Sequence, residues 1–172
     1  EARDRLFVLA VGSIAGLYGM KGSARNGEVT EAGRCQGAKV LAETLAPVAR
    51  GTVAGVQVPA TPRPVPQISF ASPDGKPLTL ADFRGRTVLL NLWATWCPPC
   101  REEMPALQAF YEEHRSNGFV LIAIDQGETE KEVVPFMEEY SLTFPVWLDP
   151  ASMAGAAFNT MNLPSSYVID RT

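Results

Sequence analysis

The chain has 172 residues, of which 46% are hydrophobic and 20% are charged, and its formal net charge is -4 at pH 7. This length and composition predict one globular domain with additional segments, and they exclude a wholly disordered chain and a protein with many membrane spans. The negative net charge also argues against a nucleic-acid-binding protein, because phosphate backbones are held by strongly positive surfaces.

Residues 6–20 form an uncharged, largely apolar stretch with basic residues on both sides. As a helix, this stretch would be about 22 Å long, which is short of the ~30 Å hydrocarbon core of a bilayer. We expect residues 1–21 to be a retained membrane anchor rather than a cleaved signal peptide, because no small-x-small cleavage site follows the apolar stretch. A buried core helix is a third interpretation of the same residues.

Residues 22–66 separate this segment from the rest of the chain. Residues 32–49 predict a helix with four apolar side chains on one face, namely Val40, Leu41, Leu45 and Val48. Four prolines between residues 59 and 66 then predict a stiff, extended linker. We place the boundary of the main domain after this linker, so that the domain covers residues 67–172.

Within this domain, apolar strand-like runs alternate with helix-like segments. Strands are predicted at residues 68–70, 87–93, 119–125, 145–148 and 165–169. Helices are predicted at residues 98–116, 129–140 and 150–158. Thr129 and Glu132 form a potential capping box for the second of these helices, which Pro135 should kink or restart. The alternation predicts βαβ units and a largely parallel sheet.

The motif Trp96-Cys97-Pro98-Pro99-Cys100 lies where a predicted buried strand meets the start of a helix. Two cysteines three residues apart on a helical turn lie close enough to open and close a disulfide with little backbone motion. Cys97 is at the helix cap, where the helix dipole and free N–H groups favour a thiolate, and Cys100 is one turn inside and more shielded. We therefore predict that Cys97 attacks a partner's disulfide and that Cys100 resolves the mixed disulfide.

The neighbours of the two cysteines should tune this chemistry. Pro99 has no N–H group, so only the N–H of Cys100 can donate to a sulfur at the cap. A less stabilised thiolate disfavours the reduced form of the cysteine pair and so makes the pair a weaker oxidant. Strongly oxidising dithiol proteins show the opposite case, because their reduced form is stabilised. Trp96 is expected to flank the cysteines as an apolar platform that limits access of water to the sulfurs, and Pro98 to begin the helix.

Metal and haem sites do not fit the distribution of ligands. A four-ligand zinc site would need Cys35, Cys97, Cys100 and His114 together, because the chain has three cysteines and one histidine. On a continuous helix, His114 would lie roughly 21 Å from Cys100. A haem attachment motif needs a histidine directly after the second cysteine, where the chain has Arg101. We therefore predict redox chemistry without a metal ion or another cofactor.

Four segments resemble one known family. The sequence NLWATWCPPCREEMP at residues 91–105 resembles the active-site segment of the membrane-anchored thioredoxin-like oxidoreductases of the TlpA/ResA/CcmG group. The similarity continues in DGKPLTLADFRGR at residues 74–86, FPVWLD at residues 144–149 and LPSSYVID at residues 163–170. It covers about residues 64–170, and the motifs are specific when taken together. The N-terminal segment and the helix that follows it most resemble the TlpA members of this group.

The resemblance implies a thioredoxin-like α/β fold, in which helices flank a central mixed sheet, with a strand and a helix inserted at residues 140–160. The thioredoxin core has one more strand and a final helix than residues 67–172 supply. We therefore expect this chain to lack the last strand and helix, which would leave an unpaired sheet edge. We also expect Cys35, which is the odd cysteine, to pair with a cysteine beyond residue 172.

The resemblance also implies roles for residues around the cysteine pair. Pro164 matches the cis-proline that faces the pair in this family and helps to hold the backbone of the partner. Glu103 matches a glutamate near the disulfide that could carry the proton of Cys100, although periodicity does not distinguish it from the adjacent Glu102. Asn91 stands where thioredoxins proper have a buried aspartate, which makes a proton carrier such as Glu103 more necessary.

These observations predict a thiol:disulfide oxidoreductase whose redox-active disulfide is Cys97–Cys100. The resemblance implies a reductant on the periplasmic side of the bacterial inner membrane, or free in the periplasm if the N-terminal segment is cleaved. Its partners would be oxidised apocytochrome c or copper-centre assembly proteins, and a membrane protein would supply its electrons. The alternatives are an oxidant or isomerase with the same chemistry, a copper-carrying binding protein and a thiol peroxidase.

Overall fold

The computed structural model describes residues 17–19, 39–40, 42–47, 57–59, 63–71 and 76–171. Most of the predicted membrane segment and the odd cysteine Cys35 lie outside the described residues. Within the described part of the chain, none of the helices combines the length and the apolar character that a membrane crossing requires.

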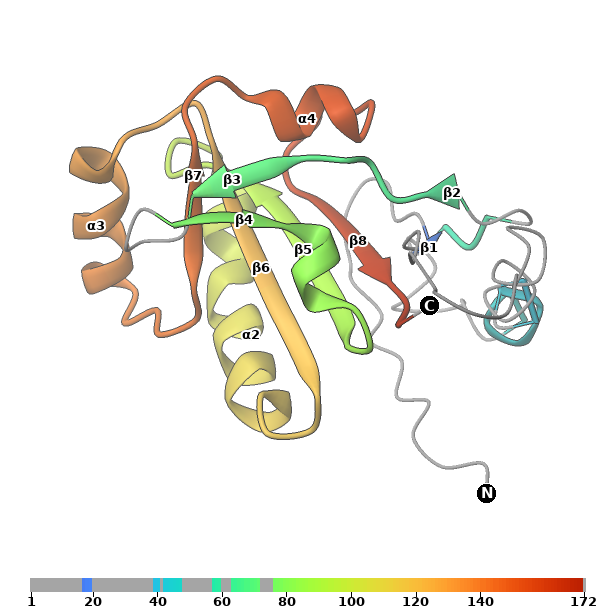
Figure 1. Cartoon of the computed structure of the whole chain (residues 1–172). Coiled ribbons are helices and arrows are strands. Elements are labelled where there is room, and N and C mark those ends of the chain that lie inside the picture. Colours follow the sequence, from blue (N-terminus) through green and yellow to red (C-terminus); the bar gives the residue numbers. More distant parts are fainter. Residues whose placement is uncertain are drawn as a thin grey trace.

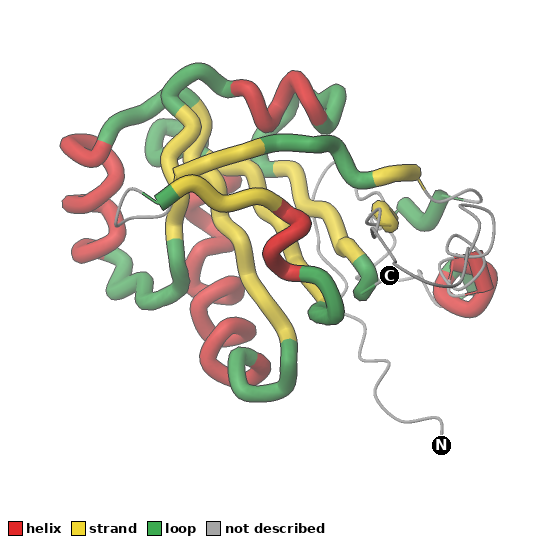
Figure 2. The backbone as a smooth tube through the Cα atoms, in the orientation of Figure 1, coloured by secondary structure: helices red, strands yellow, loops and turns green. Residues whose placement is uncertain are grey.

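The described strands form one sheet in the order β2-β1-β8-β5-β6-β7-β3-β4, and Figure 2 shows these strands side by side in yellow. The strands are β1 (Leu17–Gly19), β2 (Arg63–Pro64), β3 (Ser69–Ala71), β4 (Pro77–Thr79), β5 (Thr87–Trp93), β6 (Phe119–Gln126), β7 (Val146–Asp149) and β8 (Ser165–Ile169). The helical elements are η2 (Leu80–Phe83), α2 (Pro98–His114), α3 (Glu130–Glu139) and α4 (Met153–Ala157).

The sheet is mixed. Strands β5, β6 and β7 are parallel, as the βαβ pattern predicted, whereas β8 is antiparallel to β5 and β3 is antiparallel to both β7 and β4. The expectation of a largely parallel sheet therefore holds only for the centre. Strand β8 runs in the opposite direction because the five-residue helix α4 is too short to carry the chain back to the other end of the sheet.

Two apolar clusters cover the two faces of the sheet. In β5, Leu89 and Trp93 face the cluster that contains α2 and α3, whereas Leu90 and Leu92 face the cluster that contains α4 and η2. Side chains alternate in the same way along β6, as the period of two in a strand requires. Because both of their faces are covered, β5 and β6, which lie in the centre of Figure 1, are apolar along almost their whole length.

The central helices begin as the sequence predicts. Cys97 is the N-cap of α2, with prolines in its first two positions, and Thr129 with Glu132 forms the capping box of α3. The expected restart at Pro135 is wrong, because α3 is one uninterrupted helix. The proline removes only the hydrogen bond to the carbonyl of Lys131, and both residues are exposed, so that water can satisfy the freed carbonyl.

The edge of the sheet beyond β8 differs from expectation. Strand β1 pairs in parallel with β8, placing Leu17 beside Val168 and Tyr18 beside Ile169, and β2 pairs with β1. The prediction of an unpaired edge is therefore wrong where β1 pairs with Val168 and Ile169, and Leu17–Gly19 is a strand where the apolar stretch was considered as a helix. The exposed N–H and C=O groups along β8 offer any extended segment a row of hydrogen bonds, and β1 takes them.

The segment before the main domain also contacts it. Residues 39–40 and 42–45 are helical, within the helix predicted over residues 32–49. Leu45 packs against the apolar cluster that contains α2, whereas Val40, which was expected on the same face, is exposed. Val65, in the predicted linker, is buried against the cluster on the other face of the sheet.

Candidate active site

The two cysteines of the motif lie at the carboxyl end of β5, where the chain turns into α2. The N–H of Cys97 donates to the carbonyl oxygen of Ala94 at 3.3 Å, which closes a tight turn directly after the strand. Cys97 and Cys100 form a disulfide with their Cα atoms 5.3 Å apart, within the ordinary range for a disulfide. The predicted pair is therefore brought together on the first turn of α2.

The capping of the Cys97 sulfur agrees with the prediction made from the prolines. Its Sγ atom accepts a hydrogen bond from the N–H of Cys100 at 3.3 Å, and Pro99 offers no donor. Cys97 is 3% exposed and Cys100 is fully buried, as expected for an attacking and a resolving cysteine. Trp96, which is 65% exposed, stands beside them at the surface, where Pro98 is also exposed.

A groove of about 750 Å³ opens at the cysteine pair. Cys97 lies on one side of it, and the segment from Ser152 to Leu163 supplies most of the other side. Apart from Cys97, the described residues that line it carry no ionisable side chain. The peptide bond between Leu163 and Pro164 is cis, which confirms the predicted conformation and places the start of this proline loop at the groove.

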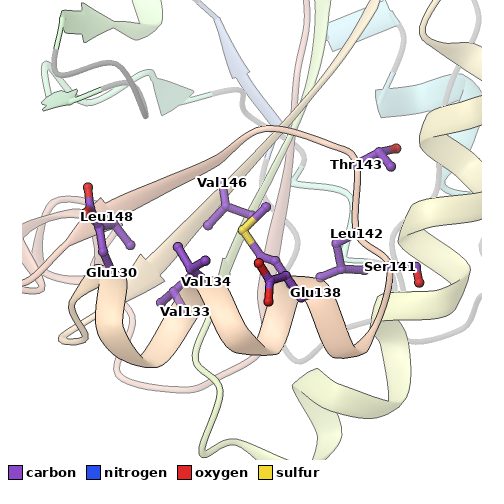
Figure 3. Close-up of a pocket in the computed structure, with 10 residues that line it drawn as sticks. Glu130, Val133, Val134, Glu138, Ser141, Leu142, Thr143, Val146 and Leu148 are labelled. Atoms are coloured by element: carbon purple, nitrogen blue, oxygen red, sulfur yellow. The ribbon is translucent and has the colours of Figure 1, made fainter.

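A second groove, of about 590 Å³, lies between α3 and β7 (Figure 3). Its walls are mainly apolar, with Val133, Met137 and Val146 among them, and Glu130 and Glu138 stand on α3. No cysteine is among the described residues that line this groove, so the redox chemistry belongs to the first one.

Glu103 is half-buried, whereas its neighbour Glu102 is exposed. The Nδ2 group of Asn91 donates to Oε1 of Glu103 at 2.8 Å and to Oγ of Ser166 at 3.0 Å. Burial raises the pKa of Glu103 to about 7, and the hydrogen bond from Asn91 opposes this increase. Glu103, three residues after Cys100, therefore has a carboxyl group that is able to exchange a proton near neutral pH.

Sequence reasoning missed a second group of acidic residues near the motif. Asp125 ends the apolar run of β6, beside Trp93 in the strand register, and is fully buried. Burial and the side chain of Glu128 raise the pKa of Asp125 to about 8. Glu128 is also buried, and its carboxylate accepts two hydrogen bonds from Thr95. A charged residue in an otherwise apolar strand is the signal that could have drawn attention to this group.

The geometry leaves the remaining candidate ligand far from the sulfurs. His114 is the last residue of α2 and packs against Phe110, with ring centroids 4.4 Å apart. Within the described ranges, no three side chains of histidine, cysteine, aspartate or glutamate lie close enough together to hold a metal ion. The arrangement at the motif is suited to thiol–disulfide exchange by Cys97 and Cys100.

Comparison with known proteins places this geometry in a family. The sequence profile described as the AhpC/TSA family matches residues 62–172. The thiol-disulfide oxidoreductase ResA of Bacillus thuringiensis subsp. konkukian is 39% identical over 98 residues, which are 57% of this chain and 57% of that protein. The chain therefore spans little more than half of the length of this relative. The resemblance to the ResA-containing group that the motifs indicated is confirmed.

Solved structures show the same fold. A thiol:disulfide interchange protein of the thioredoxin family from Chlorobium tepidum TLS is 33% identical, with a TM-score of 0.57, and the match covers 66% of this chain and 81% of that one. A secreted thiol-disulfide isomerase from Corynebacterium glutamicum is 28% identical, with a TM-score of 0.57, covering 63% and 70%. The thioredoxin-like fold with a central mixed sheet is thereby confirmed. The strand β7 and the helix α4 lie in residues 140–160, where the inserted strand and helix were expected.

Proposed function

This chain belongs to the AhpC/TSA family, and we propose that it is a thiol:disulfide oxidoreductase that acts on cysteine pairs of other proteins. The observation that carries the proposal is the Cys97–Cys100 disulfide on the first turn of α2, with Cys97 lining an open groove. A structural disulfide has no need of a groove at one of its sulfurs, whereas an exchanging disulfide must be reached by a second sulfur.

The reaction proceeds in two exchanges when the protein acts as a reductant. The thiolate of reduced Cys97 attacks one sulfur of the partner's disulfide, so that a mixed disulfide forms and one partner thiolate leaves. The thiolate of Cys100 then attacks Sγ of Cys97, which releases the second partner thiolate and leaves the Cys97–Cys100 disulfide. Two electrons pass to the partner, which gains two thiols, and a membrane protein that donates electrons returns this protein to its reduced form.

Glu103 is suited to take the proton that Cys100 must lose before the second exchange. With a pKa of about 7, its carboxyl group is populated in both protonation states at neutral pH and can accept and release a proton. The hydrogen bond from Asn91 holds Oε1 in place, on the same face of the sheet as the cysteines. The buried aspartate of thioredoxins proper is thus replaced by an asparagine that positions a glutamate from the helix.

The groove indicates what kind of segment the partner presents. Its lining has no ionisable side chain apart from Cys97, and the exposed side chains of Trp96 and Met161 stand at it. Burying a charged group there would leave the charge without a counter-ion, so the residues that flank the partner's cysteine should be uncharged or apolar. The family resemblance adds that Pro164 contacts the backbone of that segment.

We further propose that the protein is a reductant in the assembly of c-type cytochromes or of the copper centre of cytochrome oxidase. The similarity to ResA and to the TlpA/ResA/CcmG motifs supports this role. A tether in residues 1–21 would hold the domain on the periplasmic side of the inner membrane. The second candidate function is that of an oxidant or isomerase, in which the same cysteine pair accepts electrons from the partner or rearranges its disulfides. One solved relative is a secreted thiol-disulfide isomerase.

The test uses the full chain with Cys100→Ser and a peptide that carries an oxidised CXXCH motif. We expect a mixed disulfide between Cys97 and the peptide, seen by mass spectrometry and reversed by dithiothreitol. The double variant Cys97→Ser, Cys100→Ser is the matched control and should form none. A reduced wild-type protein that transfers no electrons to this peptide or to an oxidised peptide with a two-cysteine copper site would refute the proposal. A reduction potential at the strongly oxidising end of the known range would favour the second candidate.

A further inference from the structure

The residue that leads into the redox motif is held by a buried carboxylate. Oε2 of Glu128 accepts a hydrogen bond from the backbone N–H of Thr95, and Oε1 accepts one from the hydroxyl of Thr95, both at 2.6 Å. Hydrogen bonds to a carboxylate are shorter and stronger than those between neutral groups. Both donors of Thr95 are therefore engaged by one side chain from a distant part of the sequence.

The carboxylate of Glu128 is itself anchored to the sheet. The backbone N–H of Glu128 donates to Oδ1 of Asp125 at 3.1 Å, and Asp125 pairs with Trp93 in the register between β6 and β5. Glu128 is 8% exposed and Asp125 is fully buried. A continuous set of contacts thus runs from the end of β5, across β6, and back to the turn that follows β5.

We propose that Glu128 is a positioning residue of the redox site: by holding both donors of Thr95, it fixes the turn from which Cys97 enters α2. Asp125 anchors Glu128 in this role. The inference rests on the proposed function, since it concerns the same cysteine pair.

The position of Thr95 explains why this contact matters to the sulfur. Because the N–H of Cys97 donates to the carbonyl of Ala94, Thr95 and Trp96 are the two central residues of that turn. Rotation of the turn would move Sγ of Cys97 relative to the N–H of Cys100 that caps it, and relative to the groove. A displacement of about 1 Å at a reacting atom can cost up to about 100-fold in rate.

The protonation of Asp125 is compatible with this arrangement. At neutral pH a carboxyl group whose pKa is about 8 is mainly protonated, so that Asp125 adds no second negative charge beside Glu128. The acidic groups that act on Asp125 are Glu128 and, more weakly, Glu132 at the start of α3. The pair therefore keeps one carboxylate directed at Thr95 without strong repulsion.

The experiment measures how fast Cys97 reacts with iodoacetamide in the Cys100→Ser background, from pH 5 to 9, and how fast the oxidised CXXCH peptide forms the mixed disulfide. We expect Glu128→Ala to slow both reactions about tenfold. Glu128→Gln should recover most of the rate, because its amide oxygen can accept from the N–H of Thr95 and its amide nitrogen can donate to the hydroxyl. Recovery by glutamine separates positioning from an effect of the negative charge.

Asp82→Ala is the matched control. Asp82 accepts hydrogen bonds from the N–H and the hydroxyl of Thr79, at 2.7 and 2.9 Å, but stands at the start of η2, before β5 begins. This variant loses the same kind of contact and should leave the reactivity of Cys97 unchanged. If Glu128→Ala does not fold, Thr95→Val is compared with Thr95→Ser, and only the valine variant, which lacks the hydroxyl, should react more slowly.

Two results would overturn the inference. One is a Glu128→Ala protein that folds and reacts as fast as the wild type, and the other is a Glu128→Gln protein as slow as Glu128→Ala. If Glu128→Ala is not folded, equal rates for Thr95→Val and Thr95→Ser overturn it as well. A wild-type protein that exchanges with neither peptide refutes the proposed function instead, so the two failures are distinguishable.

Discussion

Replacing Glu103 with glutamine removes a half-buried ionisable group but keeps the size of the side chain and an oxygen that can accept from Asn91. In the wild type, burial raises the pKa of Glu103 from 4.5 to about 7. Between these two values the folded protein holds a proton that the unfolded chain has lost, so the free energy of unfolding falls as the pH rises. The glutamine variant should lack this dependence.

The size of the effect follows from the two pKa values. The difference corresponds to about 3 kcal/mol at a pH well above 7, and about 2.5 kcal/mol of it develops between pH 5 and pH 8. Relative to the wild type, Glu103→Gln should therefore gain about 2.5 kcal/mol of stability over this range. Asp125, whose pKa is also raised, contributes a pH dependence of the same sign to both proteins, and this contribution cancels in the difference.

The assay is urea unfolding of the oxidised protein, followed by circular dichroism at pH 5, 6, 7 and 8. Glu102→Gln is the matched control, because Glu102 is the exposed neighbour on the same helix and should show no such trend. A difference between Glu103→Gln and the wild type that stays constant from pH 5 to pH 8 would refute the reasoning, since it would mean that Glu103 ionises equally well in the folded and unfolded chains.

Three further predictions concern the capping of the sulfur, the groove and the core. Pro99→Gly adds an N–H donor at the cap, so it should lower the pKa of Cys97 and raise the reduction potential of the pair. The pKa is measured by an iodoacetamide pH profile and the potential by a redox titration with glutathione. An unchanged or lower potential contradicts this prediction. Trp96→Ala should raise the KM for the oxidised CXXCH peptide about tenfold, which corresponds to a loss of about 1.4 kcal/mol in binding. The reaction with a small disulfide reagent should be unchanged. Equal effects on both reactions argue against a role of Trp96 in binding. Ile122→Ala, at a fully buried position of β6, should cost about 2–5 kcal/mol in the free energy of unfolding by urea, and a loss below about 1 kcal/mol would show that the site collapses around the cavity.

The sequence predicted the central elements well because their signals are local. The runs at residues 87–93 and 165–169 coincide with β5 and β8, since both are rich in β-branched, aromatic or aliphatic residues and follow a turn residue, Gly85 or Pro164, closely. The cap at Cys97 and the capping box at Thr129 also depend on neighbours within one turn. Elements of this kind carry their own boundaries, so a single sequence suffices to find them.

The elements that were missed depend on distant partners. Strands β1, β2 and β4 have two or three residues each, which is too short for a period of two to be detected. Each exists because another strand offers hydrogen bonds along its edge. The contact between Glu128 and Thr95 was missed for the same reason: it spans 33 positions in the sequence and requires β5 and β6 to be in register.

Glu103 and Glu128 differ in how many hydrogen bonds their carboxyl groups accept, and this difference separates their roles. Oε1 of Glu103 has one hydrogen-bond donor, Asn91, and the pKa of Glu103 is about 7, so it can gain and lose a proton during turnover. Both oxygens of Glu128 are occupied by the donors of Thr95, and protonating that carboxylate would disturb one of these short contacts. Loss of Glu103 should therefore change how the exchange rate depends on pH, whereas loss of Glu128 should lower the rate at every pH. If both variants altered the pH profile in the same way, the separation of proton transfer from positioning would be wrong.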